Sequence, residues 1–158
     1  MMPPLFDFDL KRVSSEHYIT EKAAINFPHS GCTTGGGHYM SYFGRVSGVA
    51  KVLLAGIHYP DTTVFFGEQG IINATDLFAK WGWMTEVQIL FMADHYRAAA
   101  DMVMKWALSE SKHCNIELAE WFPSADEKQR LLDLLDTGKS KLQRIGKLEK
   151  VELWLSSQ

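Results

Sequence analysis

The sequence predicts an α+β fold in which a hairpin-rich first half is followed by alternating strands and helices. Three observations support this. Turn residues and glycines separate short β-branched and aromatic runs up to about residue 67. Beyond that point, apolar residues gather at helical spacing in two segments, 95–109 and 125–136. The length of 158 residues and the apolar content of 46% are those of one globular domain covering residues 1–158.

The first half is expected to form an antiparallel β-meander. Pro28 ends one strand, Ser47-Gly48 is a tight hairpin turn between two β-rich runs, and Pro60-Asp61 forms the next turn. The expected strands are residues 5–10, 18–27, 38–46, 49–58 and 62–67. In the hairpin register, Phe43 faces Val52 and residue 42 faces residue 53.

The second half is expected to continue as strand-helix-strand-helix-strand, after a short helix that Asn73 or Thr75 caps. Asp94 caps the first long helix, and Ser124 with Glu127 forms a capping box for the second. The expected strands lie at residues 87–91, 116–122 and 150–155. Such alternation implies crossover connections, and therefore a mixed sheet with helices mainly on one face.

The segment 95–109 carries a polar stripe on an apolar background, the reverse of an ordinary surface helix. Its polar residues, Arg97, Asp101, Lys105 and Ser109, recur every four positions. We therefore expect a mostly buried helix that exposes one ridge, on which these side chains form a ladder. It is either the central helix of the domain or part of a subunit interface.

Composition narrows the class of protein. With 16 Lys and Arg against 19 Asp and Glu, the net charge of -3 argues against nucleic-acid binding. The longest uncharged stretch, residues 23–44, contains Pro28 and several glycines, so no membrane span is expected. Two distant cysteines and an N-terminus unlike a signal peptide indicate a soluble, cytoplasmic protein. One basic cluster is expected to be a solvated loop and strand face: Lys139, Lys141, Arg144, Lys147 and Lys150.

A glycine-rich loop at residues 32–38 is the first candidate for a ligand site. Glycines allow a backbone to approach a ligand, and successive amides can bind an anion. The predicted ligand-binding residues are Thr33, Thr34, Gly35, Gly36 and Gly37. The spacing matches neither a nucleotide P-loop nor a dinucleotide fingerprint. A plain connection between strands is the alternative.

Cys32 and His38 flank these glycines and are weak candidates for a nucleophile and its base. Catalysis would need an activated thiolate and a third group to orient the base, and no such group is evident. A zinc site would need two close ligand pairs. Only His29 and Cys32 are so spaced, so we predict no metal site, and the sequence identifies no cofactor.

Arg45, Gly48 and Ala50 resemble the Arg-x-x-Gly-x-Ala pattern with which acetyltransferases of the GNAT family hold acetyl-CoA. That resemblance implies a helix after the pattern, whose N-terminal amides bind the pyrophosphate. Residues 50–58 are β-branched at first and contain Gly56, which disfavours a helix.

Two functional hypotheses follow. The first is a non-enzymatic bacterial binding protein of the inhibitor or immunity type, which meets a protein partner or a second copy of itself. It is motivated by the acidic balance and by aromatic residues such as Trp154, expected to point outward from a strand. The second is a small-molecule-binding domain or enzyme centred on residues 32–38, with acetyl transfer or Cys/His chemistry. A concave pocket would favour the second, and a flat apolar patch the first.

Overall fold

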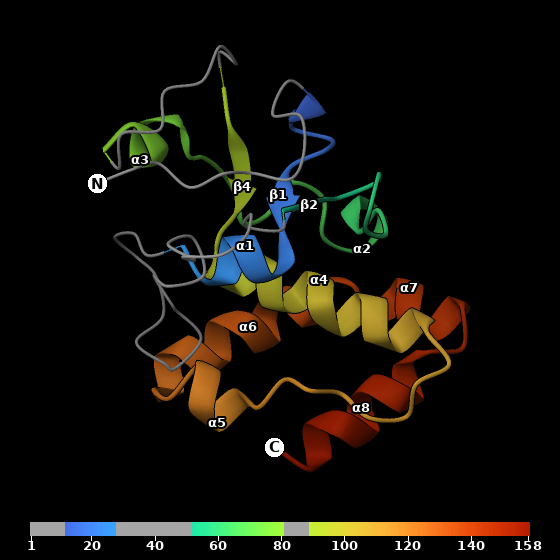
Figure 1. Ribbon diagram of the computed structural model, residues 1–158. Helices are drawn as coiled ribbons and strands as arrows, with labels where there is room; N and C mark the ends of the chain where they lie inside the picture. Colours follow the sequence, from blue (N-terminus) through green and yellow to red (C-terminus); the bar gives the residue numbers. More distant parts are fainter. Residues whose placement is uncertain (1–11, 28–51, 81–88) are drawn as a thin grey trace.

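The computed structural model describes residues 12–27, 52–80 and 89–158 and confirms an α+β fold with a mixed sheet (Figure 1). Within these residues, four short strands pair in the order β2-β1-β4-β3. They are β1 (Ile19–Thr20), β2 (Leu53–Leu54), β3 (Ile71–Asn73) and β4 (Phe91–Ala93). β1 is antiparallel to β2 and parallel to β4, and β3 is antiparallel to β4. Ile19 lies opposite Leu54 on one side and Met92 on the other.

Helices make up most of the rest of the described chain. They are α1 (Glu21–Ile25), α2 (Thr63–Phe66), α3 (Thr75–Lys80), α4 (His95–Leu108), α5 (Leu118–Trp121), α6 (Ala125–Thr137), α7 (Lys139–Arg144) and α8 (Leu148–Ser156). Figure 1 shows α4 in the middle, with the sheet on one side and α6 and α8 on the other. None of the described helices is long and apolar enough to cross a membrane.

Helix α4 is buried because two apolar clusters meet on it. Ala98 belongs to the cluster beneath the sheet, together with Ile19, Phe27 and Met92. A second cluster lies among α4, α6, α7 and α8, and the α4 residues in it are Tyr96, Ala99, Ala100, Val103, Met104 and Ala107. The expectation of a mostly buried helix is therefore confirmed, and the alanines let neighbouring elements pack closely.

The predicted helix caps are also confirmed. Asp94 accepts a hydrogen bond from the Arg97 amide at 2.8 Å, which fixes the start of α4. Ser124 and Glu127 form both hydrogen bonds of the capping box, each 3.1 Å long. Asn73 accepts from the Thr75 amide before α3. Such local signals work because the donor and acceptor lie within a few residues of one another.

Four expected strands are wrong over most of their length. Within residues 18–27 only Ile19–Thr20 is extended, and the alanines that follow belong to α1. The segment 62–67 is α2, because Asp61 accepts hydrogen bonds from the amide and hydroxyl of Thr63 and so turns the chain. The segments 116–122 and 150–155 contain α5 and α8 instead.

Other expectations are only partly within the described residues. The strands at 5–10 and 38–46, and with them the proposed hairpin register, lie outside the described residues. Of the expected strand 49–58, only Leu53–Leu54 is a strand, and residues 56–58 form a turn. The basic cluster lies on and between α7 and α8 rather than on a loop and a strand.

The edge where the sheet meets α4 depends on a glycine. The Asp94 amide donates to the Gly70 carbonyl at 2.7 Å, and Gly70 has a φ of 78°. A Cβ there would lie 2.6 Å from the Arg97 Cβ. Gly146, between α7 and α8, has a similar φ of 74°, but a Cβ on it would meet nothing within 4 Å.

These two glycines form a matched pair for mutation. We expect Gly146→Ala to lower the free energy of unfolding by about 1–2 kcal/mol, from backbone strain alone. Gly70→Ala should cost about 1–3 kcal/mol more, because the new methyl group clashes with the first turn of α4. Urea denaturation of both variants measures the difference, and equal losses would contradict the steric explanation.

Candidate functional site

The residues that the sequence singles out for ligand chemistry lie outside the described residues. These are Cys32, Thr33, Thr34, Gly35, Gly36, Gly37 and His38, so their role stays a prediction. His58 is described, and its Nδ1 accepts a hydrogen bond from the Leu54 amide in a turn. Among the described residues, no group of His, Cys, Asp and Glu side chains is arranged to hold a metal ion.

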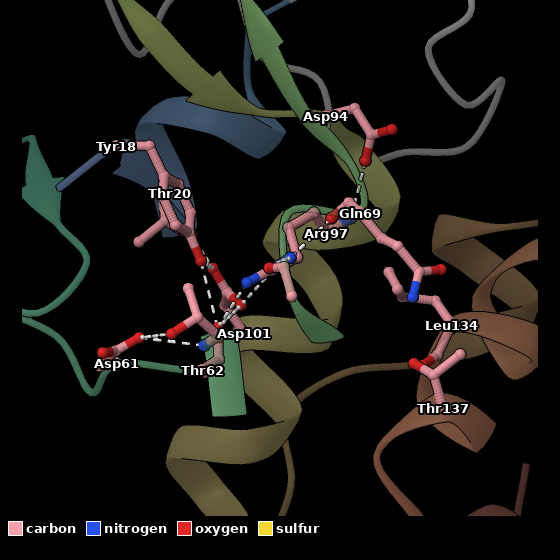
Figure 2. A network of polar contacts seen from close by, with 12 residues as sticks. Tyr18, Thr20, Asp61, Thr62, Gln69, Asp94, Arg97, Asp101, Leu134 and Thr137 are labelled. Atoms are coloured by element: carbon pink, nitrogen blue, oxygen red, sulfur yellow. Dashed lines mark hydrogen bonds and ion pairs between the residues drawn. The ribbon is translucent and has the colours of Figure 1, made fainter. Parts of the chain in front are cut away.

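A buried polar network centred on Asp101 is the most highly connected polar feature of the described chain (Figure 2). Tyr18 and Thr20 donate from β1 and the residue before it, each at 2.7 Å to Oδ2. Thr62 and the Arg97 Nε donate to Oδ1. Because a carboxylate without partners is very costly to bury, these four donors together make the position of Asp101 possible.

The Arg97 guanidinium uses its remaining donors on two backbone carbonyls and one hydroxyl. Its Nη1 donates to the carbonyls of Gly67 and Gln69 at 2.8 and 2.6 Å, and its Nη2 donates to the Thr62 hydroxyl. The rings of Tyr18 and Phe66 lie 5.3 and 5.2 Å from the guanidinium carbon. Both charged side chains are fully buried and fully partnered, so we regard this network as structural.

The network corrects the expectation of an exposed ladder on α4. Arg97 and Asp101 are 0% exposed, whereas Lys105 is exposed and Ser109 is half-buried. The ladder therefore divides at the middle of the helix. Its first half is covered by β1 and by the residues around α2, and only its second half reaches solvent.

A groove of about 920 Å³ lies between residues 109–117 and α8. Among the residues that line it are Trp106, Cys114, Ile116, Lys147, Lys150, Leu153 and Trp154. Lys150 donates to the carbonyls of Trp106 and Ser109 at 3.0 and 2.9 Å, which caps the C-terminus of α4. The groove is thus built where α4 ends against α8.

Helical geometry reverses the expected orientation of two side chains in α8. Trp154, expected to point outward, is 7% exposed, and its Nε1 donates to the Ile116 carbonyl at 3.3 Å. Leu153, expected on the buried face, is 72% exposed. In a strand, neighbours 151, 153 and 155 share a face, but in a helix it is 151 and 154 that do so.

Cys114 lies in the wall of the groove as a free thiol. Burial raises the pKa of this thiol above its ordinary value. A nucleophilic cysteine needs the opposite shift, since the thiolate is the reactive form. The burial of Cys114 and the direction of its pKa shift are those of a cysteine that packs in the structure.

A second, smaller cavity of about 230 Å³ shares part of its lining with the groove, including Cys114 and Ile116. One face of α4 contributes Met102, Lys105, Trp106 and Ser109, and the remaining lining includes Glu21, Tyr59 and residues 111 and 113–116. The Lys105 Nζ lies 4.6 Å from the centre of the Tyr59 ring. The only buried donor without a partner among the described residues, Trp106 Nε1, belongs to a residue of this face.

Sequence reasoning found neither opening. The face of α4 that lines the smaller cavity has the spacing i, i+3, i+4 and i+7, so this signal was present. This spacing did not indicate a cavity, because Met102 and Trp106 are residue types that usually belong to the core. Many of the residues that complete both openings lie in the segment 110–115, for which the sequence indicated no element.

Comparisons with known proteins add no further information on function. No protein-family model, no curated protein and no solved structure matches the chain.

The ion pair in the network leads to a prediction about stability. Asp101→Asn removes one charge and leaves Arg97 buried and uncompensated, so we expect a loss of about 3–5 kcal/mol in the free energy of unfolding. Thr20→Val removes one charge-assisted hydrogen bond and should cost about 1.5–3 kcal/mol. Asp136→Ala, at an exposed position, should change it by less than about 0.5 kcal/mol. Urea denaturation that ranked the three variants differently would contradict this account.

Tyr59 leads to a prediction about pH. Burial, followed by the carboxylates of Glu21 and Asp101, raises the pKa of Tyr59 well above its ordinary value of 10.0. The folded state therefore holds this proton more tightly than the unfolded state does. The stabilisation is complete below about pH 10 and is lost as the pH rises further, by up to about 1.4 kcal/mol per pH unit.

Tyr59→Phe keeps the ring and removes this proton. Its free energy of unfolding should match that of the wild type within about 0.5 kcal/mol near pH 7, and should fall less steeply above about pH 10. Urea denaturation across this range tests the prediction. Parallel curves for the two proteins in alkali would contradict it.

Proposed function

We propose that the protein is a non-enzymatic binding protein, and that the groove between residues 109–117 and α8 holds an extended segment of a protein partner. The observation that carries the proposal is Leu153, whose side chain is 72% exposed at a groove of about 920 Å³ walled by two tryptophans. A large apolar side chain exposed beside such a groove is typical of an interaction site.

The composition of the groove supports this proposal. Trp106, Ile116 and Trp154 supply its apolar wall. Charged side chains of both signs surround them, namely Glu110, Lys112, Glu117 and Lys147. Protein interfaces have the same arrangement, with an apolar centre and a polar rim. The ring centres of Trp106 and Trp154 are 6.2 Å apart, so the two side chains contact each other in this wall.

The backbone beside the groove supports an extended partner segment. Residues 111–117 belong to no helix or strand. In the described part of the chain, the exposed residues Lys112, His113 and Asn115 have amides without a hydrogen-bond partner. A partner backbone that runs alongside would pair with such groups, as in recognition by strand addition, while its side chains contact Leu153 and Trp154.

Site-specific photocrosslinking in the native host tests the proposal. A benzophenone amino acid at position 153 should crosslink a distinct protein through one short peptide. The same group at Val64, which is 61% exposed on α2, should not crosslink it. With the purified partner, Leu153→Glu should weaken binding by roughly tenfold or more, because a charge would enter the apolar centre. Val64→Glu should leave the affinity unchanged.

Two outcomes would overturn the proposal. The first is a crosslinked partner that binds Leu153→Glu as tightly as it binds the wild type. The second is self-association of the pure wild-type protein in sedimentation velocity that Leu153→Glu abolishes, since the occupant would then be a second copy of the chain. Circular dichroism of each variant establishes that it is folded.

A further inference from the structure

The smaller cavity shares part of its lining with the proposed partner groove but also has charged residues of its own. Glu21 and Lys105 both line it, and no ion pair joins either of them to another residue in the described chain. Glu21 is half-buried and Lys105 is exposed, whereas the fully buried Arg97 and Asp101 are paired with each other. An unpaired carboxylate and an unpaired ammonium group therefore face one small space.

Tyr59 adds a hydroxyl to this lining. The side chain is 4% exposed, yet within the described chain its hydroxyl has no hydrogen-bond partner. Tyr59 is one of the residues that line the cavity. A buried tyrosine normally satisfies its hydroxyl, so a free one beside a cavity indicates a place for a ligand atom.

The backbone holds Glu21 at this position. Glu21 directly follows β1 and has a φ of 63°, which is unfavourable for a residue with a Cβ. The residue before it, Thr20, is anchored because its hydroxyl donates to Asp101 at 2.7 Å. The network that fixes α4 thus also fixes the turn that carries the carboxylate, and the cavity is preorganised.

Size and lining limit the chemistry of a ligand. At about 230 Å³ the cavity lies below the common range of roughly 300–1,000 Å³ for ligand pockets. It therefore suits a small metabolite and not a nucleotide or coenzyme A. Met102, Trp106 and Ile116 contribute apolar surface for a short side chain. The charged groups of Glu21 and Lys105 favour a ligand with one anionic and one cationic end.

We propose that this cavity binds a free α-amino acid with an apolar side chain. Its carboxylate pairs with Lys105 and accepts a hydrogen bond from Tyr59, its ammonium group pairs with Glu21, and its side chain contacts Met102 and Trp106. The pairing offsets the cost of bringing both charges out of water.

Isothermal titration calorimetry of the full chain with the standard L-amino acids tests the proposal, with leucine as the first probe. We expect saturable binding of leucine or a similar apolar amino acid. For leucine, 3-methylbutylamine and 4-methylpentanoate each lack one of the charged groups and should bind at least roughly tenfold more weakly. If the amino acids give no saturable heat at millimolar concentration, the proposal is wrong.

Variants locate the site. Glu21→Gln and Lys105→Met each remove one charge and should weaken binding by roughly tenfold or more. Tyr59→Phe should weaken it by a smaller factor. Lys112→Met and Leu153→Glu alter the groove but not the cavity, so both should bind normally. Equal affinity in Lys105→Met and Lys112→Met would overturn the proposal. Because Lys105 is exposed, its substitution leaves the fold intact, even if the strained turn at Glu21 tolerates no change.

Discussion

The buried ion pair between Arg97 and Asp101 is the constraint on which the rest of the structure depends. Two charges without access to water are tolerated only when every donor and acceptor has a partner. Those partners come from β1, from Thr62 before α2 and from the carbonyls of Gly67 and Gln69 after it. The sheet, the α2 region and α4 must therefore assemble together, because none of them can satisfy the pair alone.

This constraint also decides where α4 is open to solvent. The N-terminal half of the helix packs against the sheet, the second apolar cluster and the polar network, which leaves no exposed side. Beyond Asp101 the network ends, and one face of the helix becomes the wall of the smaller cavity. The C-terminus of α4, capped by Lys150, then forms the end of the groove. Both openings thus lie along the C-terminal part of the helix that the buried network holds in place.

The sequence was sufficient to predict those features of the fold that depend on interactions between residues close together in the chain. The caps of α4 and α6 join residues three positions apart, so spacing alone identifies them. The polar network could not be predicted in this way, because Asp101 is bonded to residues 39, 81 and 83 positions away. Helical spacing places Arg97 and Asp101 on one face but does not say what covers that face. The alternation of apolar and other residues at 150–155 predicted a strand, but the segment belongs to α8. The reason is related, since Val151 and Trp154 are buried by helices distant in sequence.

The groove and the smaller cavity share lining residues, so the binding of a ligand in one is expected to affect binding in the other. Trp106, Cys114 and Ile116 line both openings. In this shared wall Trp106 belongs to α4, whereas Cys114 and Ile116 belong to irregular backbone that the hydrogen bond from Trp154 to the Ile116 carbonyl holds to α8. A ligand that moved this wall from one side would change the affinity on the other side. By linkage, the second ligand would then change the affinity for the first by the same factor. Residues 111–117, which contribute to both openings, belong to no helix or strand, and such a segment moves more easily than a helix.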